Sequence, residues 1–363
     1  MCTSLTLKTD DFYVGRNLDL EYAFGERVIL TPRAYLFPFR RKPAHRARYA
    51  MLGMGNVTDG YPLYAEAVNE KGLYIAGLNF PGNAWYEPLV DEIQTLSGSQ
   101  KADRQKAWDE ISPFELIPWI LSQCETMEQV RNLLKRLRLV KIHFKKELPL
   151  TPLHWHIADR NQSIVLEAMR DGLHVYDNPV GVLTNNPPFP FQLMNLNQYL
   201  NLTANYPESR FGKTGGQNSS EQQTEWQLRP FGQGMGAIGL PGDYSPASRF
   251  AKIAFGRTNS APKKGEAASI AQFFHLLDSV AMPEGSVITP EGKYDKTTYS
   301  CCINADKGIY YYKTYENSQV TAVRMHGENL DGETLKEFPL VQELQIRYVN
   351  GAADEVLGSA EAD

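Results

Sequence analysis

MCTSLTLKTDDFYVGRNLD, residues 1–19, is the stretch that decides how the rest of the chain is interpreted. An initiator methionine is generally trimmed when the next side chain is small, so we expect a mature chain that begins at Cys2 with a thiol and a free α-amine. Their unperturbed pKa values are about 8.5 and about 8, so a modest electrostatic bias near neutral pH gives a thiolate beside a neutral amine. Arg16 could supply that bias. By position alone, however, Cys2 is more simply the second residue of an ordinary strand.

The same stretch predicts a β-hairpin. Polar and apolar residues alternate over residues 3–8, residues 10–11 are two turn-forming aspartates, and a strand-forming run resumes at residue 12. The turn would bring the second strand back toward the chain start.

A two-residue turn would place Asp19 opposite Cys2 and Arg16 opposite Leu5. Both charged side chains are then near the chain start. Because side chains alternate between the two faces of a strand, Arg16 and Asp19 point to opposite faces unless a bulge intervenes. We therefore expect an irregularity over residues 15–18.

The composition is typical of one large globular domain. The chain has 363 residues, of which 42% are hydrophobic, and no linker divides it. Its net charge of -5 gives no reason to expect nucleic acid or an acidic surface as a partner. The one basic run, residues 40–48, is more simply a solvated loop than a binding patch.

The sequence also predicts the compartment. The chain start lacks the pattern of a secretory signal, and no apolar run approaches the length of a membrane span. Cysteines at positions 2, 124, 301 and 302 are too few and too unevenly spaced for a disulfide framework. We therefore expect a cytoplasmic protein that has no membrane partner.

Helix and strand signals alternate along the rest of the chain. Capping patterns predict helices that begin near Ser112, Thr126, Ser245 and Ser269, with Pro118 limiting or kinking the first of them. Alternating or continuous apolar runs predict strands at 28–32, 49–54, 73–80, within 153–184 and within 297–325. Polar stretches predict loops at 81–111 and 205–229 and an acidic tail at 350–363.

Two patterns allow both a structural and a functional interpretation. His154 and His156 fall on one face of a predicted strand, a spacing that metals use, but no third ligand is apparent, so a packed or hydrogen-bonded pair is the better interpretation. Glycines over residues 232–242 suggest a nucleotide-binding loop. They precede no suitable strand-turn-helix unit, however, and close approach of the backbone is favoured.

Several blocks of sequence, in the right order, resemble the choloylglycine hydrolase family of N-terminal nucleophile hydrolases. They are MCTSLTL, GRNLDLEY, GLNFPGNAWY, SPFELIPW, LPLTPLHW, LTNNPPF, GLPGDYSPASRF and YYYKTYENSQ. The resemblance implies an α+β fold, a four-layer αββα sandwich of two stacked antiparallel sheets flanked by helices. The domain would span residues 1–349, with loop insertions at 94–110 and 205–226.

The resemblance also implies the site. The family's nucleophile falls on Cys2, and its two charged neighbours fall on Arg16 and Asp19. Two active-site asparagines match Asn79 and Asn185, and an arginine close to the site matches Arg249. Beside the hairpin, Leu18, Tyr22 and Phe24 are candidates, together with Asn79, for the wall of a substrate pocket. Each of the three could equally be core packing.

The implied reaction is hydrolysis of the amide that joins a bile acid to glycine or taurine. The Cys2 thiolate attacks the carbonyl, a thioester forms, and the α-amine of Cys2 moves protons. Amide donors from Asn79 and Asn185 stabilise the oxyanion, which is worth roughly 3 to 4 kcal/mol per donor in comparable sites. The steroid needs an apolar pocket, and no metal or organic cofactor is needed. The resemblance further implies a homotetramer.

Three rival interpretations remain at this stage. A penicillin V acylase would use the same nucleophile on a phenoxyacetyl amide, but Asn79 favours the bile-salt branch, since penicillin-preferring relatives tend to carry a bulky aromatic there. A catalytically silent steroid-binding protein is disfavoured by the intact set of site residues. A papain-like protease is disfavoured because the other three cysteines lie in apolar contexts without a glycine-rich nucleophile stretch.

Overall fold

A computed structural model describes residues 1–89, 108–209 and 228–350. Most of the predicted insertions at 94–110 and 205–226, and of the tail from residue 350, therefore lie outside the described residues. No helix in the described ranges is long and apolar enough to cross a membrane.

The N-terminal hairpin is present, but its register differs from the predicted one. Strands β1 (Cys2–Lys8) and β2 (Phe12–Leu20) flank a loop of residues 9–11, and Cys2 pairs with Leu18. The predicted two-residue turn is wrong because residue 9 belongs to the loop, where the Thr9 N–H donates to the Asp11 carbonyl at 3.0 Å. Every cross-strand partner is therefore shifted by one residue.

The irregularity predicted for residues 15–18 is wrong, and the register shift lies on the neighbouring strand instead. Pairing between β1 and β2 is regular, whereas β16 (Tyr294–Asn304) shifts register between Thr297 and Tyr299, opposite Asp19 and Leu18 of β2. Since β2 itself has no bulge against β1, Arg16 and Asp19 point to opposite faces of the sheet.

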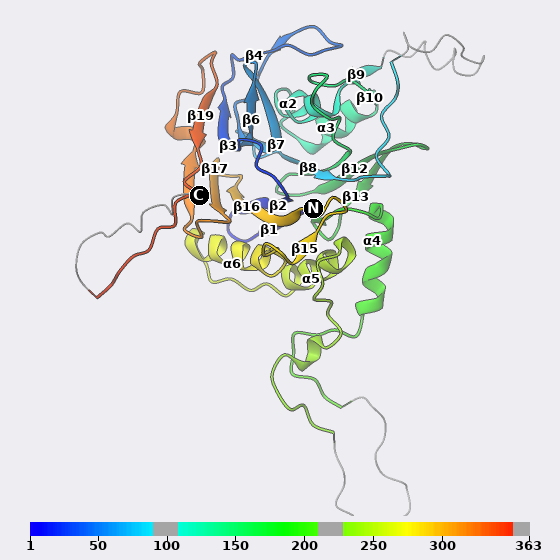
Figure 1. Ribbon diagram of the computed structural model, residues 1–363, viewed down its shortest axis with the longest axis vertical. Helices are drawn as coiled ribbons and strands as arrows, with labels where there is room; N and C mark the ends of the chain where they lie inside the picture. Colours follow the sequence, from blue (N-terminus) through cyan, green and yellow to red (C-terminus); the bar gives the residue numbers. More distant parts are fainter. Residues whose placement is uncertain (90–107, 210–227, 351–363) are drawn as a thin grey trace, which may run out of the picture.

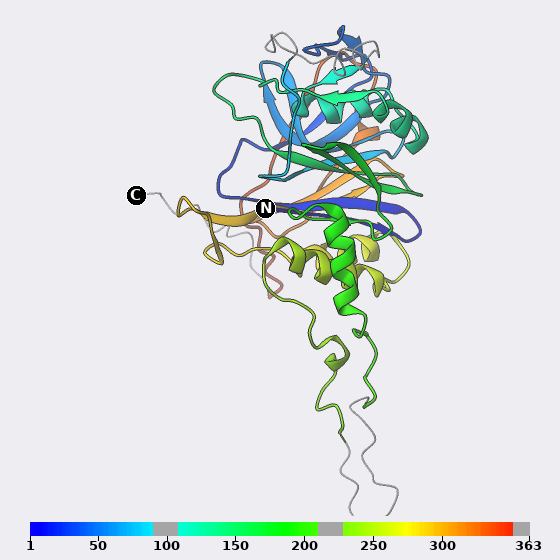
Figure 2. The ribbon, with the colours of Figure 1, turned by 90° about the vertical axis from the view of Figure 1, so that its right-hand side faces the viewer.

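Two antiparallel sheets form the centre of the molecule (Figures 1 and 2). Sheet A has the order β14 (Val182–Leu183), β1, β2, β16, β17 (Ile309–Thr314) and β18 (Thr321–Arg324), and β15 (Val287–Ile288) also pairs with β16. Sheet B has the order β13 (Gly172–Asp177), β12 (Ser163–Met169), β11 (Leu153–Ala158), β8 (Tyr74–Asn79), β7 (Tyr61–Asn69), β6 (Met51–Thr58), β3 (Arg27–Thr31) and β19 (Lys336–Pro339). Outside these sheets, β4 (Leu36–Phe37) pairs with β5 (His45–Arg46), and β9 (Asp109–Ile111) pairs with β10 (Leu137–Leu139).

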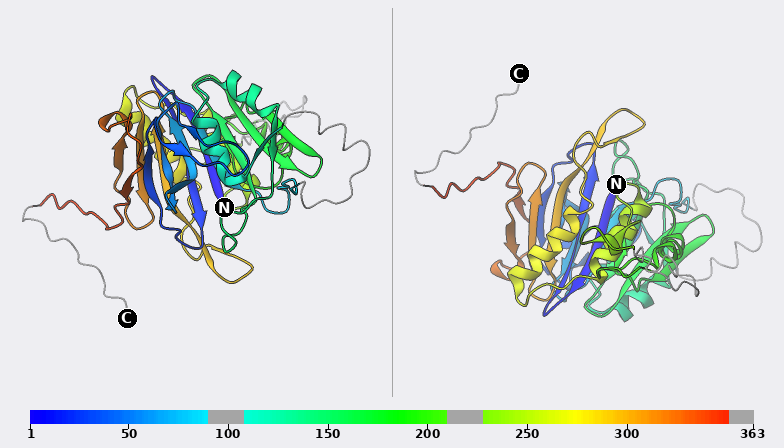
Figure 3. Two further views of the ribbon diagram at one scale, coloured as in Figure 1. Left: turned by 90° about the horizontal axis from the view of Figure 1, so that it is seen from above. Right: turned by 90° about the horizontal axis from the view of Figure 1, so that it is seen from below.

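Helices cover the outer face of each sheet, which completes the expected four layers (Figures 2 and 3). On sheet A lie α5 (Pro246–Thr258) and α6 (Glu266–Asp278), with α4 (Phe189–Asn195) beside them; on sheet B lie α2 (Leu116–Leu121) and α3 (Met127–Leu134). The short 3-10 helices are η3 (Pro113–Glu115), η4 (Leu196–Tyr199), η5 (Met235–Ala237) and η6 (Met325–Gly327).

The helix starts follow their caps with one exception. Ser112 and Glu115 form the predicted capping box, and the Thr126 hydroxyl accepts from Gln129 N at 3.3 Å at the start of α3. Helix α6 begins at Glu266 rather than Ser269, because the Glu266 carboxylate bonds to side chains that are distant in sequence, including Tyr311 at 2.6 Å. That contact has no local signal.

Alternation along the strands divides the core into two apolar clusters. Along β8, Ala76 and Leu78 belong to the cluster that includes residues of both sheets, whereas Ile75 belongs to the cluster under α2 and α3. Full burial of one such large apolar side chain contributes about 1.5–3 kcal/mol. Cys2 and Leu18 lie in the first cluster. The chain start is thus built into the packed centre of the molecule.

Candidate active site

Cys2 lies at the start of β1 with its side chain toward sheet B. It shares this face with Ser4, whose hydroxyl contacts Tyr74 and His156 of sheet B. Only 3% of Cys2 is exposed. Its backbone N–H donates to Asn185 Oδ1 at 2.9 Å, and its carbonyl accepts from the Arg249 guanidinium at 2.6 Å. The residue is therefore fixed through both of its backbone polar groups.

Arg16 shares the Cys2 face and is completely buried. Its Nη1 donates to the Gly77 carbonyl at 2.6 Å and lies 3.6 Å from the Glu66 carboxylate, whereas Nη2 has no hydrogen-bond partner within the described residues. Burial alone would lower the pKa of Arg16, but negative charge on Cys2, Tyr299 and Glu66 raises it. Arg16 is therefore a buried cation on the face that carries Cys2.

Glu66 holds this buried cation in place from sheet B. Its two oxygens accept hydrogen bonds from the hydroxyls of Tyr299, at 2.8 Å, and Tyr310, at 2.5 Å. Burial raises the pKa of Glu66, while Arg16 and the tyrosine hydroxyls act in the opposite direction. Sequence reasoning missed Glu66, because only the packing of the two sheets brings it to Arg16.

Asp19 lies on the opposite face, toward the helices, but its backbone lies beside the chain start. Its N–H donates to the Met1 carbonyl at 2.8 Å, and its carbonyl accepts from the Met1 ammonium at 2.5 Å. One carboxylate oxygen accepts from Thr297 at 2.6 Å, and the other has no partner among the described residues. Asp295, which the sequence did not indicate, lies 3.2 Å from the Met1 ammonium.

Asn185 and Arg249 form one hydrogen-bonded unit around Cys2. Arg249, 1% exposed on α5, donates from Nη2 to Asn185 Oδ1 at 2.6 Å and from Nη1 to Thr3 Oγ1 at 2.5 Å. Two donors face Asn185 Oδ1, so the amide orientation is settled and Nδ2 donates to the Asn79 carbonyl at 2.7 Å. Burial lowers the pKa of Arg249. An arginine fork of this kind positions its partners more firmly than a lysine would.

Asn79 ends β8 at the edge of this unit. Its side chain is partly exposed and makes no hydrogen bond within the described ranges, so its amide is available to a ligand. The structure thus joins Asn185 and Arg249 to the backbone of Cys2 and places the Arg16 side chain on the same face as Cys2. Asp19 contacts Met1, and Asn79 contacts Asn185, through their backbone carbonyls.

Comparison with known proteins identifies the family of the chain. Residues 2–338 match the model of the linear amide C-N hydrolases, choloylglycine hydrolase family. The chain belongs to this family. The expected family, four-layer fold and enzyme class are therefore confirmed for this choloylglycine hydrolase family member.

Its relatives and structural neighbours are similar over almost the full length. It is 44% identical to a bile salt hydrolase/transferase of Lactiplantibacillus plantarum, covering 96% of this chain and 100% of the relative. It is 39% identical to a bile salt hydrolase/transferase of Clostridium perfringens, and this match covers 96% of this chain and 100% of the relative. A crystal structure of a mutant conjugated bile acid hydrolase from Clostridium perfringens superposes with a TM-score of 0.83 at 38% identity, covering 96% of this chain and 100% of that one. A penicillin V acylase from Agrobacterium tumefaciens shares the fold, with a TM-score of 0.69 at 16% identity over 94% of this chain and 92% of that chain.

The other cysteines of this family member lack the features of a nucleophile. Cys124, Cys301 and Cys302 are all free and buried. Burial raises the pKa of Cys124 to about 12 and the pKa values of Cys301 and Cys302 well above their usual range. Since the thiolate is the reactive form, these three thiols are poor nucleophiles near neutral pH.

The predicted pocket residues have different surroundings. Leu18 is 5% exposed and lies directly across from Cys2. Tyr22 is 54% exposed in the loop after β2, whereas Phe24 is partly buried against the inter-sheet core. Leu18 therefore borders the nucleophile, and the exposed ring of Tyr22 can contact a ligand at the surface.

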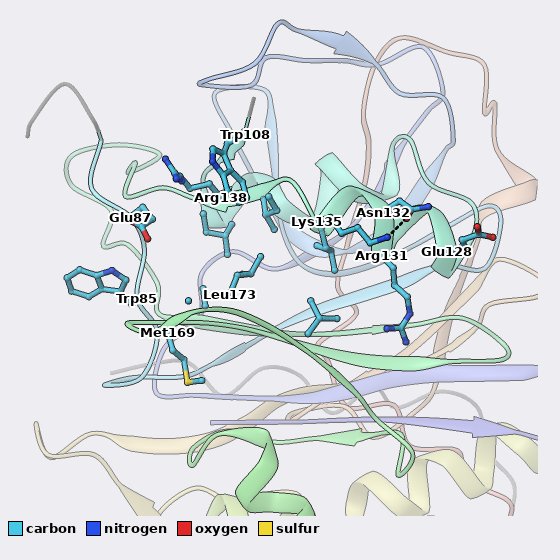
Figure 4. A pocket seen from close by; sticks show the side chains of 16 residues that line it. Trp85, Glu87, Trp108, Glu128, Arg131, Asn132, Lys135, Arg138, Met169 and Leu173 are labelled. Atoms are coloured by element: carbon cyan, nitrogen blue, oxygen red, sulfur yellow. Dashed lines mark hydrogen bonds between the residues drawn. The ribbon is translucent and has the colours of Figure 1, made fainter. Parts of the chain in front are cut away.

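Two described cavities lie away from this site. One, of about 850 Å³, lies between α3, β10 and the β12–β13 hairpin, and Trp85, Arg138 and Met169 are among its lining residues (Figure 4). A second, of about 410 Å³, includes Arg257. Neither is lined by a predicted site residue. The position of the two cavities gives no support to a role for either of them in a reaction at Cys2.

The two histidines of β11 are buried and hydrogen-bonded, as predicted, each to other residues. Both are fully buried, and both ring nitrogens of each have polar partners. Burial lowers the pKa of His156 to about 3, so it is neutral at ordinary pH. Within the described part of the chain, no three His, Cys, Asp or Glu side chains are grouped to hold a metal ion.

Proposed function

We propose that this choloylglycine hydrolase family member cleaves the amide bond between bile acids and glycine or taurine, with Cys2 as its N-terminal nucleophile. The observation that carries the proposal is the fixed position of Cys2, whose backbone nitrogen and carbonyl are held by Asn185 at 2.9 Å and Arg249 at 2.6 Å. Relatives named as bile salt hydrolases at 44% and 39% identity support the substrate class.

Removal of Met1 would convert the Cys2 amide nitrogen into an α-amine at the same place. That nitrogen already faces Asn185 Oδ1. The free carboxylate oxygen of Asp19, which is buried and lacks a partner among the described residues, is a suitable acceptor for a second hydrogen of the amine. The neutral amine would then act as the base for the Cys2 thiol.

In the first half-reaction, the Cys2 sulfur attacks the substrate carbonyl and a tetrahedral intermediate forms. The Asn79 amide and the remaining Nδ2 hydrogen of Asn185 donate to its oxyanion, each contributing about 3–4 kcal/mol. The C–N bond then breaks, the Cys2 ammonium protonates the departing nitrogen of glycine or taurine, and a thioester remains. Water, deprotonated by the same amine, hydrolyses the thioester and restores the thiol.

Substrate tests separate this proposal from its closest rival. We expect the purified protein to release glycine and taurine from conjugated bile salts much faster than it releases phenoxyacetate from penicillin V, and Cys2→Ala to release neither. Faster cleavage of penicillin V would move the assignment to an acylase. Binding of bile salts without turnover by the protein that has lost Met1 would favour a silent steroid-binding protein.

We also propose a homo-oligomer, the expected state being a tetramer. The segment that follows α4 extends away from the body (Figures 1 and 2), and its described part exposes Leu200 by 77% and Phe231 by 91%; Met194 of α4 itself is 71% exposed. Exposed apolar groups of this kind are typical of association surfaces. Light scattering of the parental protein and of Phe231→Ser tests this; a monomeric parental protein would contradict it.

The proposed compartment is the cytoplasm. All four cysteines are free, which suits a reducing environment. Fractionation of the source cells, with the activity assayed in each fraction, tests this location.

A further inference from the structure

His154 contacts the two segments that carry the candidate oxyanion donors. Its ring stacks on Phe80, with ring centroids 4.3 Å apart and an interplanar angle of 5°. Phe80 directly follows Asn79. On its other side, the Nε2 atom of His154 lies 3.0 Å from the carbonyl oxygen of Thr184, the residue before Asn185. One buried ring therefore touches the neighbour of each asparagine.

The polar partners of His154 fix the orientation of the ring. A carbonyl oxygen can only accept, so Nε2 carries a hydrogen and donates it to Thr184. Nδ1 lies 3.0 Å from Glu167 Oε1, and both His154 and Glu167 are fully buried. Glu167 also accepts at 3.0 Å from the N–H of Phe189, the first residue of α4. Rotation of the ring would leave buried polar atoms unpaired, which costs about 1–3 kcal/mol each.

The two asparagine segments are also joined by Asn186 Nδ2, which donates to the Pro81 carbonyl at 2.6 Å. Asn185 Nδ2 donates to the Asn79 carbonyl at 2.7 Å, and this is the direct bond between the two asparagines. The Asn79 side chain has no hydrogen bond of its own within the described residues, so its position depends on the backbone on either side of it. That backbone continues into Phe80, which packs on His154.

We propose that His154 is a positioning residue for the hydrolysis. It holds the Asn79 and Asn185 segments at the separation at which both amides reach one oxyanion. The inference rests on the proposed function, because it assigns a role only if those amides stabilise the intermediate. A misplacement of about 1 Å in an active site can cost about 10²-fold in rate.

His156 provides a matched control on the same strand. It lies two residues further along β11 on the same face, and both histidines are 0% exposed. Its ring nitrogens contact the hydroxyls of Ser4, at 2.8 Å, and Ser163, at 2.7 Å, rather than the backbone beside either asparagine. Substitution there disturbs the strand equally without releasing either segment.

The experiment compares His154→Gln and His156→Gln with the parental protein. Steady-state release of glycine and taurine from conjugated bile salts gives kcat and KM, and the rate of Cys2 alkylation by iodoacetamide reports on the thiol. We expect His154→Gln to lower kcat about 10²-fold, with KM and the alkylation rate nearly unchanged, since alkylation needs no oxyanion donor. His156→Gln should keep the parental kcat.

Equal losses of kcat in both variants, or parental kcat in His154→Gln, would overturn the inference. So would a parallel loss of alkylation, because the defect would then lie in the nucleophile. If His154→Gln does not fold, Phe80→Leu removes only the stacked ring, and a parental kcat in that variant would also overturn it. A parental protein that is alkylated at Cys2 yet releases neither amino acid would instead refute the proposed function.

Discussion

Cys2 and Cys301 are both buried in sheet A near Arg16, but their surroundings differ. Cys301 pairs directly with Arg16 across the β2–β16 ladder, and its thiol donates to Glu66 at 3.6 Å. Burial and the charge of Glu66 raise the pKa of Cys301 well above its usual range. Proximity to a buried arginine is therefore insufficient to activate a thiol in this protein.

Cys2 differs because it lies at the chain start, where one acceptor and one donor bond to its backbone. Asn185 and Arg249 hold its nitrogen and carbonyl, and no carboxylate is bonded to its thiol within the described residues. The position of Cys2 at the terminus and the groups bonded to its backbone therefore distinguish it from Cys301. Four sets of variants test this difference, in order of decreasing expected effect.

The largest difference in activity is expected between the variants Cys2→Ala and Cys301→Ser. We expect Cys2→Ala to abolish release of glycine and taurine while leaving the fold intact, because no other thiol lies beside the amide donors. Cys301→Ser should keep near-parental turnover, since a hydroxyl can still donate to Glu66. Amino acid release and thermal unfolding of both variants are the measurements. Substantial turnover by Cys2→Ala would contradict the account.

Arg16→Met tests whether the buried cation takes part in the reaction or only balances the charge of Glu66. We expect it to remove activity and to lower the free energy of unfolding by about 3–5 kcal/mol, because Glu66 is left charged and unpaired. Adding Glu66→Gln should restore stability but not turnover. Denaturant unfolding and bile salt hydrolysis of the single and double variants measure the two effects. Recovery of turnover in the double variant would assign Arg16 a structural role alone.

Arg249→Lys and Arg257→Lys compare two arginines that hold β1 from the same helix. Arg249 donates to Cys2 and Thr3, whereas Arg257 donates to Thr6 at 2.5 Å and 3.0 Å, farther along the strand. Arg249→Lys should lower kcat about 10²-fold, since a single ammonium lacks the planar fork whose two nitrogens bond the Cys2 carbonyl and Asn185 separately. Arg257→Lys should alter stability more than kcat. Similar kinetic losses would show that the position of β1 as a whole matters, rather than the Cys2 contacts.

The buried thiols also predict a loss of stability at alkaline pH. Burial raises the pKa of Cys124 from 9.0 to about 12, so the unfolded chain loses this proton before the folded chain does. The free energy of unfolding therefore falls as the pH rises through this interval, by at most about 1.4 kcal/mol per pH unit from this group. Denaturant unfolding at several pH values should show a shallower alkaline loss in Cys124→Ala. An unchanged slope would refute the assignment.

The family resemblance predicted the layers, but the sequence did not predict the contacts between them. Alternation and capping located the N-terminal hairpin, α3 and α5 closely. Family blocks, rather than periodicity, pointed to Asn185 and Arg249, because nothing local says that residues so distant in the chain meet at Cys2.

The two missed residues have a common physical cause. Glu66 and Asp295 make contacts between strands of different segments, and each resembles an ordinary strand residue in its local pattern. The predicted hairpin register was wrong because one additional loop residue shifts every cross-strand pair. Only knowledge of which strands pair could have located them.

The central claim is that Cys2 is a free N-terminal nucleophile, and intact-protein mass spectrometry before and after iodoacetamide near neutral pH tests it most directly. The account predicts a mass lacking Met1 and a single rapid alkylation that peptide mapping places on Cys2. A protein that retains Met1, or whose label falls on Cys301 rather than Cys2, would contradict it.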